Sequence, residues 1–454
     1  MVNAAQYPFP QNAQYPHGIK ATNVNTDKIQ QSYQIFLTKY YEESGNLARI
    51  KWDNAAQTVS EGIGYGMLVM VYMDNSTNNT QSKFDKLFNY YNNFLNNNGL
   101  MNWRIDGFSG VSGANAATDA EIDVATALIM ASKQWNNVRY LNDAKALIVK
   151  MWDHEVNANG YLKPGDAWDD RKNPSYFGTA TIELFKQIDS HDWNRVLSNS
   201  YSLIKASRNS TTGFIPDWCS EAGVAIGDFY YDASRAPWRI AMAYSWFGHS
   251  DAYDINNTIA VWVKGKTGGN ASQVVDGYFL DGNNKGSWNN STFVGPLGCA
   301  GMTSGNHQSW VNSAMEKMNG YSATDEGYFS QCLKLVTSLL LSGNMPNFFS
   351  TATGVADNGA SSLKVASVRP RLKINQAAHG RITIAADIVV PGMVRITLHD
   401  ARGRLVARIA EQNTSAGLMV ADASAKCENL SDGVYFVRLM SGGVSMEQRL
   451  ELVR

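Results

Sequence analysis

The spacing of the apolar residues changes once along this chain, near residue 360. Before that point, apolar residues recur at helical spacing, as between residues 122 and 135. After it they alternate with polar residues, as in the segments 381–384, 394–398 and 434–439. The first spacing is typical of helices, and the second is typical of strands with one buried face. The chain is therefore expected to form two domains of different class.

Composition supports the same division. All twelve tryptophans lie between Trp52 and Trp310. The residues around the change in spacing are rich in Ser, Thr, Ala, Gly and Asn, which is typical of a flexible connector. We expect a mainly helical domain over 1–349, a linker over 350–368 and a small β-sandwich over 369–454.

The first domain shows no alternation of strands and helices, which disfavours a doubly wound α/β sheet. Helices joined by loops that carry Gly, Asn and Trp predict helix hairpins arranged around a centre. The stretches expected to be helical are 28–42, 61–73, 81–96, 122–135, 140–152, 176–188, 193–207, 235–247, 252–264, 306–319 and 328–342.

Charge and composition exclude several classes of function. With a formal net charge of -1, the chain gives no reason to expect a nucleic acid or a membrane surface as partner. No apolar run of about 18 residues occurs, so no membrane-spanning segment is expected. The seven histidines are scattered, and we expect neither a metal nor a cofactor. Four cysteines are expected as buried free thiols, with a Cys219–Cys299 disulfide left open; they are Cys219, Cys299, Cys332 and Cys427.

Three acidic clusters stand among glycines or aromatic residues. Glu61 lies in Ser-Glu-Gly-Ile-Gly-Tyr-Gly-Met, Asp119 in Ala-Thr-Asp-Ala-Glu-Ile-Asp, and Asp232 in Tyr-Tyr-Asp-Ala-Ser-Arg. Cleavage of a glycosidic bond needs one carboxylic acid that stays protonated near neutral pH and one carboxylate that stays ionised. Aromatic faces can receive the sugar rings. The three clusters therefore indicate a glycosidase.

Each cluster also has a purely structural interpretation. Glu61 can be an acid favoured by a helix N-terminus, and Asp119 can be another first-turn acid. Thr118 and Glu121 have the spacing of a capping box, which predicts a structural role for Glu121. Asp232 and Arg235 can form a surface ion pair of small consequence.

The aromatic residues also have two interpretations: they can pack in the core, or they can stack on a sugar ring of the substrate. Trp103 and Trp168 stand among polar residues, which favours an exposed ring that stacks on a sugar. Asp217 precedes Trp218 and is expected to line the same region as Asp232.

The chain resembles glycoside hydrolase family 8 from about residue 7 to 349. The segments at 60–67, 117–135 and 230–239 carry the resemblance, together with 15–20, 275–278 and 341–344. The resemblance implies an (α/α)6 barrel that cuts β-1,4-linked glucans, xylans or chitosan with inversion.

By the same resemblance, Glu61 is the general acid, Asp232 the general base and Asp119 the acid that grips the sugar at the cleavage point. Some branches of the family have Asn at the position of Asp232. Because this chain has Asp at that position, it resembles the branch that contains many cellulases and xylanases. Together, the motifs and the resemblance predict the following substrate-binding residues: Trp103, Trp168, Tyr176, Tyr231, Arg235, Asp217 and Tyr328.

The tail, 369–454, resembles the C-terminal sorting domain of the type IX secretion pathway. That resemblance implies a secreted or cell-surface protein of a Gram-negative bacterium. The alternative is an accessory sugar-binding module, although Tyr435 and Phe436 are the only aromatic residues of the tail.

We expect a monomeric, inverting endo-β-1,4-glucanase acting on cellulose-type or mixed-linkage β-glucan. Two alternatives stay open: a xylanase, either endo-acting or releasing xylose from reducing ends, and a non-catalytic polysaccharide-binding protein.

Overall fold

The computed structural model describes residues 3–321, 326–349 and most of 372–452, with short gaps in that last part. The chain divides into two compact units, Met1–Ala356 and Asp357–Arg454, and each is described by itself. The expected linker over 350–368 lies outside the described residues.

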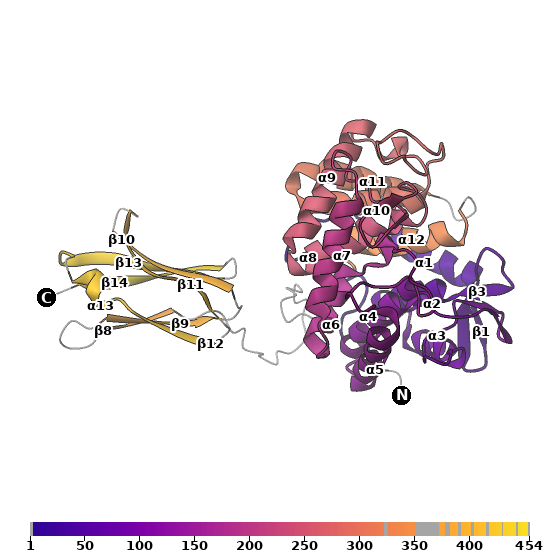
Figure 1. The fold of residues 1–454 in the computed structure, drawn as a ribbon, viewed down its shortest axis with the longest axis horizontal. Coiled ribbons are helices and arrows are strands. Elements are labelled where there is room, and N and C mark those ends of the chain that lie inside the picture. The colour runs from indigo at the N-terminus through magenta and orange to yellow at the C-terminus, as the bar shows by residue number, and fades with distance from the viewer. Residues whose placement is uncertain are drawn as a thin grey trace. The chain divides into compact units, whose positions relative to one another are not determined.

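Twelve α-helices make up most of the described part of the first unit (Figure 1). The odd-numbered helices are α1 (Thr26–Tyr40), α3 (Gln81–Asn93), α5 (Val138–Glu155), α7 (Trp193–Ser207), α9 (Ser250–Thr267) and α11 (Gln308–Gly320). The even-numbered helices are α2 (Ser60–Tyr72), α4 (Thr118–Gln134), α6 (Thr179–Ile188), α8 (Ala236–Phe247), α10 (Ser291–Ala300) and α12 (Tyr328–Leu341).

The even-numbered helices form a closed inner ring. Each packs on the next even-numbered helix, and α12 packs back on α2. Each odd-numbered helix packs outside: α3, α5, α7, α9 and α11 contact the helix before them, and α1 contacts α12. This is an (α/α)6 barrel, as expected.

The sequences of the helices explain which ring they join. In α2 every residue except Glu61 is buried, and in α10 every residue is buried. A helix that is apolar on all sides needs neighbours on all sides. The outer helices α3, α5 and α7 bury one stripe and expose the other, which suits a position between the core and water.

Among the α-helices in the described part of the first unit, only α10 was not predicted from the sequence. Its sequence, Ser-Thr-Phe-Val-Gly-Pro-Leu-Gly-Cys-Ala, contains two glycines and an internal proline. These residues are unfavourable inside helices. Packing against α8, α11 and α12 on several sides outweighs that local preference.

Short antiparallel strands connect some of the helices. They are β1 (Tyr41–Ser44), β2 (Leu47–Ile50), β3 (Gln57–Val59), β4 (Arg104–Asp106), β5 (Gly110–Gly113), β6 (Trp218–Cys219) and β7 (Ala225–Ile226). β3 leads directly into α2, and the loop after β5 leads into α4. The strand β3 pairs with β4, so this small sheet ties together the segments that precede two inner helices.

The second unit contains two antiparallel sheets around its own core. One has the order β11-β10-β13-β14 and the other the order β12-β9-β8. The strands are β8 (Leu372–Gln376), β9 (Ile382–Ile388), β10 (Gly392–Asp400), β11 (Leu405–Thr414), β12 (Gly417–Asp422), β13 (Gly433–Ser441) and β14 (Val444–Leu452), with the short helix α13 (Ser424–Cys427). Alternate residues of β10, such as Val394, Ile396 and Leu398, enter the core. The expected β-sandwich is therefore confirmed.

Two further expectations concern single residue types. The four cysteines are buried and free, so the Cys219–Cys299 disulfide does not form. Among the described helices, none is long and apolar enough to cross a membrane.

Candidate active site

The N-terminal ends of the six inner helices converge on one polar cluster. Glu61 is the second residue of α2, Asp119 is the second residue of α4 and Tyr328 is the first residue of α12. Asp232 and Arg235 belong to the turn before α8, where η2 (Ala233–Arg235) is a single 3₁₀ turn. Before α6, the turn η1 (Pro174–Tyr176) carries Tyr176, and before α10 lies Asn290.

This convergence gives the cluster a positive background. Helix N-termini carry unpaired amides and the positive end of the helix dipole. A carboxylate is stabilised there, even when it is removed from water. The closed ring therefore explains why several acids can lie together at this end of the barrel.

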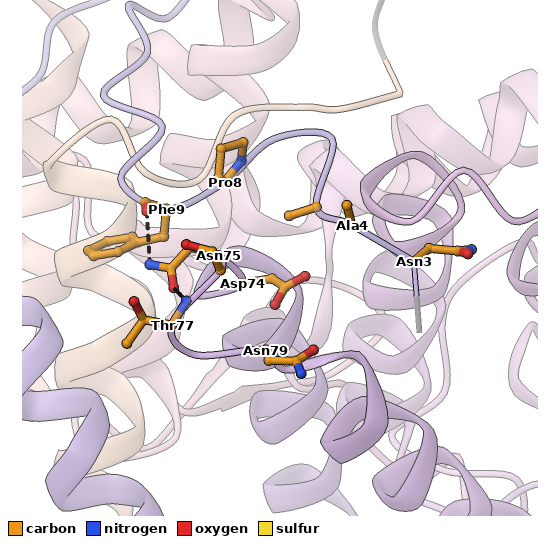
Figure 2. Close-up of a pocket in the computed structure, with 10 residues that line it drawn as sticks. Asn3, Ala4, Pro8, Phe9, Asp74, Asn75, Thr77 and Asn79 are labelled. Carbon is orange, nitrogen blue, oxygen red and sulfur yellow. Dashed lines mark hydrogen bonds between the residues drawn. The ribbon is translucent and has the colours of Figure 1, made fainter. Parts of the chain in front are cut away.

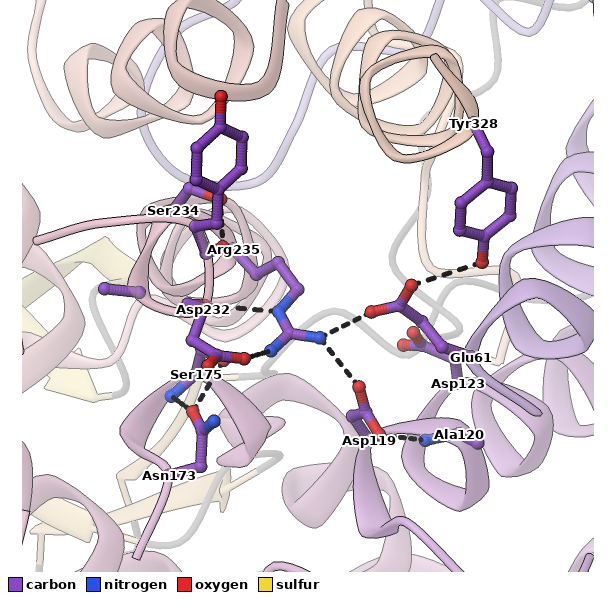
Figure 3. A network of polar contacts seen from close by, with 12 residues as sticks. Glu61, Asp119, Ala120, Asp123, Asn173, Ser175, Asp232, Ser234, Arg235 and Tyr328 are labelled. Carbon is purple, nitrogen blue, oxygen red and sulfur yellow. Dashed lines mark hydrogen bonds and ion pairs between the residues drawn. The ribbon is translucent and has the colours of Figure 1, made fainter. Parts of the chain in front are cut away.

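Arg235 lies at the centre of the cluster (Figure 3). Its Nη1 donates to Glu61 Oε2 at 2.6 Å and to Asp119 Oδ2 at 2.7 Å, and its Nη2 donates to Asp232 Oδ1 at 2.7 Å. Only 2% of Arg235 is exposed, so its pairing with Asp232 is not the surface ion pair considered above. The three acidic clusters of the sequence meet at this one guanidinium.

A second buried ion pair, Asp123 with Arg239, lies one helical turn from the pair of Asp119 with Arg235. Asp119 and Asp123 are four residues apart and share one face of α4. Arg235 and Arg239 have the same spacing at the start of α8. Asp119 pairs with Arg235, and the Asp123 carboxylate accepts two hydrogen bonds from Arg239, at 2.5 and 2.8 Å. This bidentate pair is buried and fixes α4 against α8.

The three carboxylates differ in their exposure to solvent. The side chain of Asp232 is 38% exposed, that of Glu61 is 16% exposed and that of Asp119 is 3% exposed. Water therefore reaches Asp232 most easily. Asp119 is almost closed off by protein.

Burial and neighbouring charges shift the proton affinity of the cluster. Burial raises the pKa of Glu61 to about 7, while Arg235 lowers it and the charge of Asp119 raises it. Burial also raises the pKa of Asp119 to about 6, against the effect of Arg235. The Tyr328 hydroxyl donates to Glu61 Oε1 at 3.2 Å. Glu61 is thus poised to hold and release a proton near neutral pH.

A cavity of about 350 Å³ opens over this cluster. Its lining combines the polar groups with four aromatic rings. The lining residues are Trp52, Asp53, Glu61, Tyr231, Asp232, Arg235, Tyr328 and Phe329.

The sequence did not single out Trp52, Asp53 or Phe329 of this lining. Asp53 Oδ1 accepts a hydrogen bond from the Tyr328 amide at 3.2 Å, and Phe329 lies under Arg235 with the guanidinium carbon 5.8 Å from the ring centre. Neither contact has a local sequence signal, because the partners are more than 90 residues apart in the chain.

Tyr231 lines the cavity but does not bond to the neighbouring carboxylate of Asp232. Its hydroxyl donates to Asp276 Oδ2 at 3.3 Å. Asp276 belongs to the Val-Asp-Gly-Tyr segment noted in the sequence.

Asp217 supports the turn that carries Asp232. Its Oδ1 accepts a hydrogen bond from the Ala233 amide at 2.8 Å. Burial raises the pKa of Asp217 to about 6, although the Ala233 amide lowers it. Asp217 thus lies beside Asp232, as expected, and its contact is with the backbone of the turn.

Three predicted aromatic residues differ in how they contact the cluster: Tyr176 contacts it directly, Trp168 through Trp218, and Trp103 has no side-chain hydrogen bond to the three acids. The guanidinium carbon of Arg235 lies 5.0 Å from the centre of the Tyr176 ring. Trp168 is 39% exposed, and its ring lies 5.4 Å from that of Trp218, whose Nε1 donates to Asp232 Oδ2 at 3.1 Å. Trp103 is half-buried and packs against Arg104, and it is not among the residues that line the cavity.

The predicted capping box at the start of α4 is wrong. Thr118 is already the first helical residue, and the residue in the cap position, Ala117, has no side chain that can accept a hydrogen bond. The Thr118 hydroxyl donates to the carbonyl of Lys163 at 2.8 Å, and Glu121 Oε1 accepts from the Tyr91 hydroxyl at 2.9 Å. Tertiary partners have replaced the local pair.

A larger cavity of about 670 Å³ lies at the other end of α2, beside the loop that follows this helix (Figure 2). A helix of this length separates it from Glu61 by about 20 Å. The carboxylate of Asp74 in this cavity is already occupied, because it accepts hydrogen bonds from the Thr80 amide and from Trp135 Nε1, each at 2.7 Å. The smaller cavity, with its ionisable cluster, is the candidate active site.

Comparisons with known proteins agree with this fold. Residues 7–343 match Glycosyl hydrolases family 8. Endoglucanase 2 of Ruminiclostridium josui is 34% identical over 370 residues, which cover 76% of this chain and 79% of the relative.

Two solved structures extend the comparison. The apo structure of a β-1,3-1,4-glucanase from Paenibacillus sp. X4 has a TM-score of 0.71 at 30% identity and covers 75% of this chain and 99% of its own. A reducing-end-xylose-releasing exo-oligoxylanase has a TM-score of 0.61 at 20% identity, covering 72% of this chain and 96% of its own. The latter likeness is one of fold alone.

Proposed function

Because the chain belongs to glycoside hydrolase family 8, we propose that it is an inverting endo-β-1,4-glucanase with Glu61 as acid and Asp232 as base. The observation that carries the assignment is the single guanidinium of Arg235 shared by three carboxylates of unequal exposure. The substrate we propose is cellulose-type or mixed-linkage β-glucan. The names of the endoglucanase and β-1,3-1,4-glucanase relatives support this choice.

Glu61 supplies the proton for the leaving group. When Glu61, Asp119 and Asp232 are all ionised, one arginine leaves the cluster with an excess of two negative charges. Binding one proton relieves that repulsion, and the pKa of about 7 makes Glu61 the acceptor. Protonated Glu61 can then donate to the glycosidic oxygen as the bond breaks.

Asp232 activates the attacking water. Its carboxylate accepts hydrogen bonds from Arg235 and from Trp218 Nε1, which orient it toward a substrate water. A water beside Asp232 gives up a proton to it and attacks the anomeric carbon from the face opposite the leaving group. The sugar therefore leaves with inverted configuration.

The separation of acid and base does not exceed the range that inverting enzymes use. Hydrogen bonds of 2.6 and 2.7 Å and two C–N bonds of one guanidinium join Glu61 Oε2 to Asp232 Oδ1. These two oxygens are therefore at most about 8 Å apart. Inverting glycosidases need roughly 6.5–9.5 Å between their carboxyl groups to admit the water.

In this proposal Asp119 grips the sugar at the cleavage point, which requires its 3% exposed carboxylate to become accessible from the cavity when the sugar binds. Its Oδ2 is held by Arg235, and its Oδ1 caps the amide of Ala120 at 3.1 Å. Charge-assisted hydrogen bonds to sugar hydroxyls are stronger than neutral ones and can favour a distorted ring. Arg235, whose guanidinium lies over the Tyr176 ring, holds this acid in place.

The test is hydrolysis of a panel: carboxymethyl cellulose, mixed-linkage β-glucan, xylan and chitosan, with the product anomers followed by NMR. We expect α-anomers to form first from a glucan. Glu61→Gln and Asp232→Asn should each lower kcat by about 10²–10⁴, because each removes one proton-transfer partner. β-Anomers formed first, or near-normal turnover by Glu61→Gln, would show that the assigned pair is wrong.

The panel also decides between the proposed function and its alternatives. Release from xylan alone would keep the acid and base and change the substrate to xylan, with the exo-oligoxylanase fold as precedent. Binding without any hydrolysis would favour a polysaccharide-binding protein. The presence of both Glu61 and Asp232 argues against that, since binding alone needs no acid–base pair.

We further propose that the second unit is a type IX sorting domain and that the protein is secreted or held at the cell surface of a Gram-negative bacterium. The support is the resemblance of the tail and its independent β-core. Fusion of residues 357–454 to a reporter protein should direct the reporter to the surface of a bacterium that has this pathway. A reporter retained inside such cells would refute the proposal. We also propose a monomer, which sedimentation can test.

A further inference from the structure

Trp288 exposes more of its surface than any other large apolar side chain of the described residues. It is 73% exposed, compared with 39% for Trp168. An indole in water costs hydrophobic free energy that a partner can recover. Trp288 belongs to the loop between η3 (Ala271–Gln273) and α10, and the sequence analysis did not select it.

The backbone around Trp288 is held firmly. The Trp288 amide donates to Asp276 Oδ1 at 2.8 Å. The side chain of Asn289 donates to the carbonyls of Ala271 and Val274, at 3.0 and 2.8 Å, and accepts from the Tyr321 hydroxyl at 2.6 Å. The exposed ring therefore stands on a fixed support, as a binding platform requires.

The same support reaches the catalytic cavity. The second oxygen of Asp276, Oδ2, accepts from the Tyr231 hydroxyl at 3.3 Å, and Asn290 Nδ2 lies 3.5 Å from that hydroxyl. Tyr231 lines the cavity next to Asp232. One buried carboxylate thus joins the Trp288 backbone to a cavity wall.

The contacts on the other side of Asp232 are different. Asp232 Oδ2 accepts from Trp218, which packs against the exposed Trp168. The cluster is therefore connected to two exposed tryptophans by separate contacts, through Trp218 to Trp168 and through Tyr231 and Asp276 to Trp288.

We propose that Trp288 stacks on a sugar ring of the bound glucan outside the cleavage site, on the Tyr231 side. This inference rests on the proposed function, since it assigns a further binding position for the same polymer. Covering one face of the indole removes on the order of 60 Å² of apolar surface from water. The loss of that contact is expected to weaken polymer binding about tenfold.

The experiment measures affinity for mixed-linkage β-glucan and for carboxymethyl cellulose by native gel retardation, in the full-length chain carrying Glu61→Gln. Trp288→Ala should weaken retardation about tenfold, and Trp288→Phe should restore most of it because a flat apolar ring remains. Val138→Ala is the matched control, since Val138 is 69% exposed on the outer helix α5. The control should bind like its parent.

Kinetics of the same substitutions with Glu61 intact give a second readout. Trp288→Ala should raise KM for the polymer more than for a trisaccharide, because a short substrate reaches fewer positions. Unchanged binding and unchanged KM in Trp288→Ala would refute the proposal that Trp288 stacks on a sugar. A Glu61→Gln protein that binds neither polymer would also refute it. Failure of the proposed function is a separate result: the wild-type chain would then hydrolyse no member of the panel.

Discussion

Arg235 shows how one residue can organise a cluster of acids. A buried arginine without partners would be costly, and three carboxylates without a cation would repel one another. Together they leave an excess of two negative charges, and binding one proton lowers that excess to one. The requirement for a general acid near neutral pH is thus met by the charge balance of the cluster as well as by burial.

A second acidic pair lies buried away from the cavity, on α4 and α5. Glu121 and Glu155 are both fully buried. Both oxygens of Glu155, and Oε2 of Glu121, have no hydrogen-bond partner among the described residues. The nearby Thr118 hydroxyl donates its hydrogen bond to the backbone carbonyl of Lys163 instead. Burial raises the pKa of Glu121 to about 8 and raises that of Glu155 well above its usual range.

This pair predicts that the enzyme loses stability as the pH rises from mildly acidic to mildly alkaline values. A carboxyl group whose pKa is raised on folding binds more protons in the folded state, so its contribution is fully present at low pH. For Glu121, that contribution is lost as the pH rises from about 4.3, the unfolded value, through about 8. Burial likewise raises the pKa of Glu155, so Glu155→Gln, which keeps the shape without an ionisable group, should remove the part of the pH-dependent loss that comes from Glu155.

The measurement is urea unfolding of wild-type and Glu155→Gln proteins at several values between pH 5 and 9. Glu316→Gln, at an exposed position of α11, is the control and should follow the wild type. Parallel pH dependences for wild type and Glu155→Gln would contradict a protonated pair.

At the level of elements, the inner ring depends on close helix contacts. Gly295 of α10 faces α12: a Cβ there would overlap Thr337 Oγ1 and lie 2.9 Å from Met318 Cε. The glycines Gly295 and Gly298, which weaken the helical pattern of α10 in the sequence, are therefore what allow this helix to pack closely. Local preference and tertiary fit oppose each other in this helix.

Gly295→Ala is expected to destabilise the protein by about 1–3 kcal/mol, because overpacking outweighs the better helix propensity of alanine. Gly265→Ala is the matched control, since Gly265 lies in α9 with no atom within 4 Å of the added Cβ. It should be neutral or stabilising by up to about 1 kcal/mol. Thermal unfolding with a two-state fit compares them. Equal effects of both substitutions would exclude steric overlap in the ring.

At the scale of the whole molecule, the catalytic cluster belongs to the first unit alone. That unit has its own large core, and the second unit has a separate one. The residues of the cluster range from Glu61 to Tyr328.

A chain that ends at residue 356 is therefore expected to fold and to keep the kcat/KM of the full-length enzyme on soluble β-glucan. Steady-state kinetics on the two purified proteins check this. In a bacterium with type IX machinery, only the full-length chain should reach the surface. A shortened enzyme that folds but has lost its activity would show that the second unit takes part in catalysis.

The sequence by itself determined the helical class of the first unit, the β-class of the second and the three acids of the cluster. It could do so because helical and alternating spacing are local properties, and because the acidic segments are distinctive. The sequence shows that Asp119 and Asp123, and likewise Arg235 and Arg239, have helical spacing. It does not show that the two acids pair with the two arginines, because the pairs lie 116 residues apart in the chain.

Only the tertiary structure decided which groups meet. Thr118 and Glu121 fitted a local cap, but Lys163 and Tyr91 are their partners in space. The contact of Tyr328 with Glu61 joins residues 267 positions apart, and closure of the ring brings α12 beside α2 to form it. Burial, and with it the pKa of each acid, follows from that closure, because the surroundings of a carboxyl group depend on distant helices more than on its sequence neighbours.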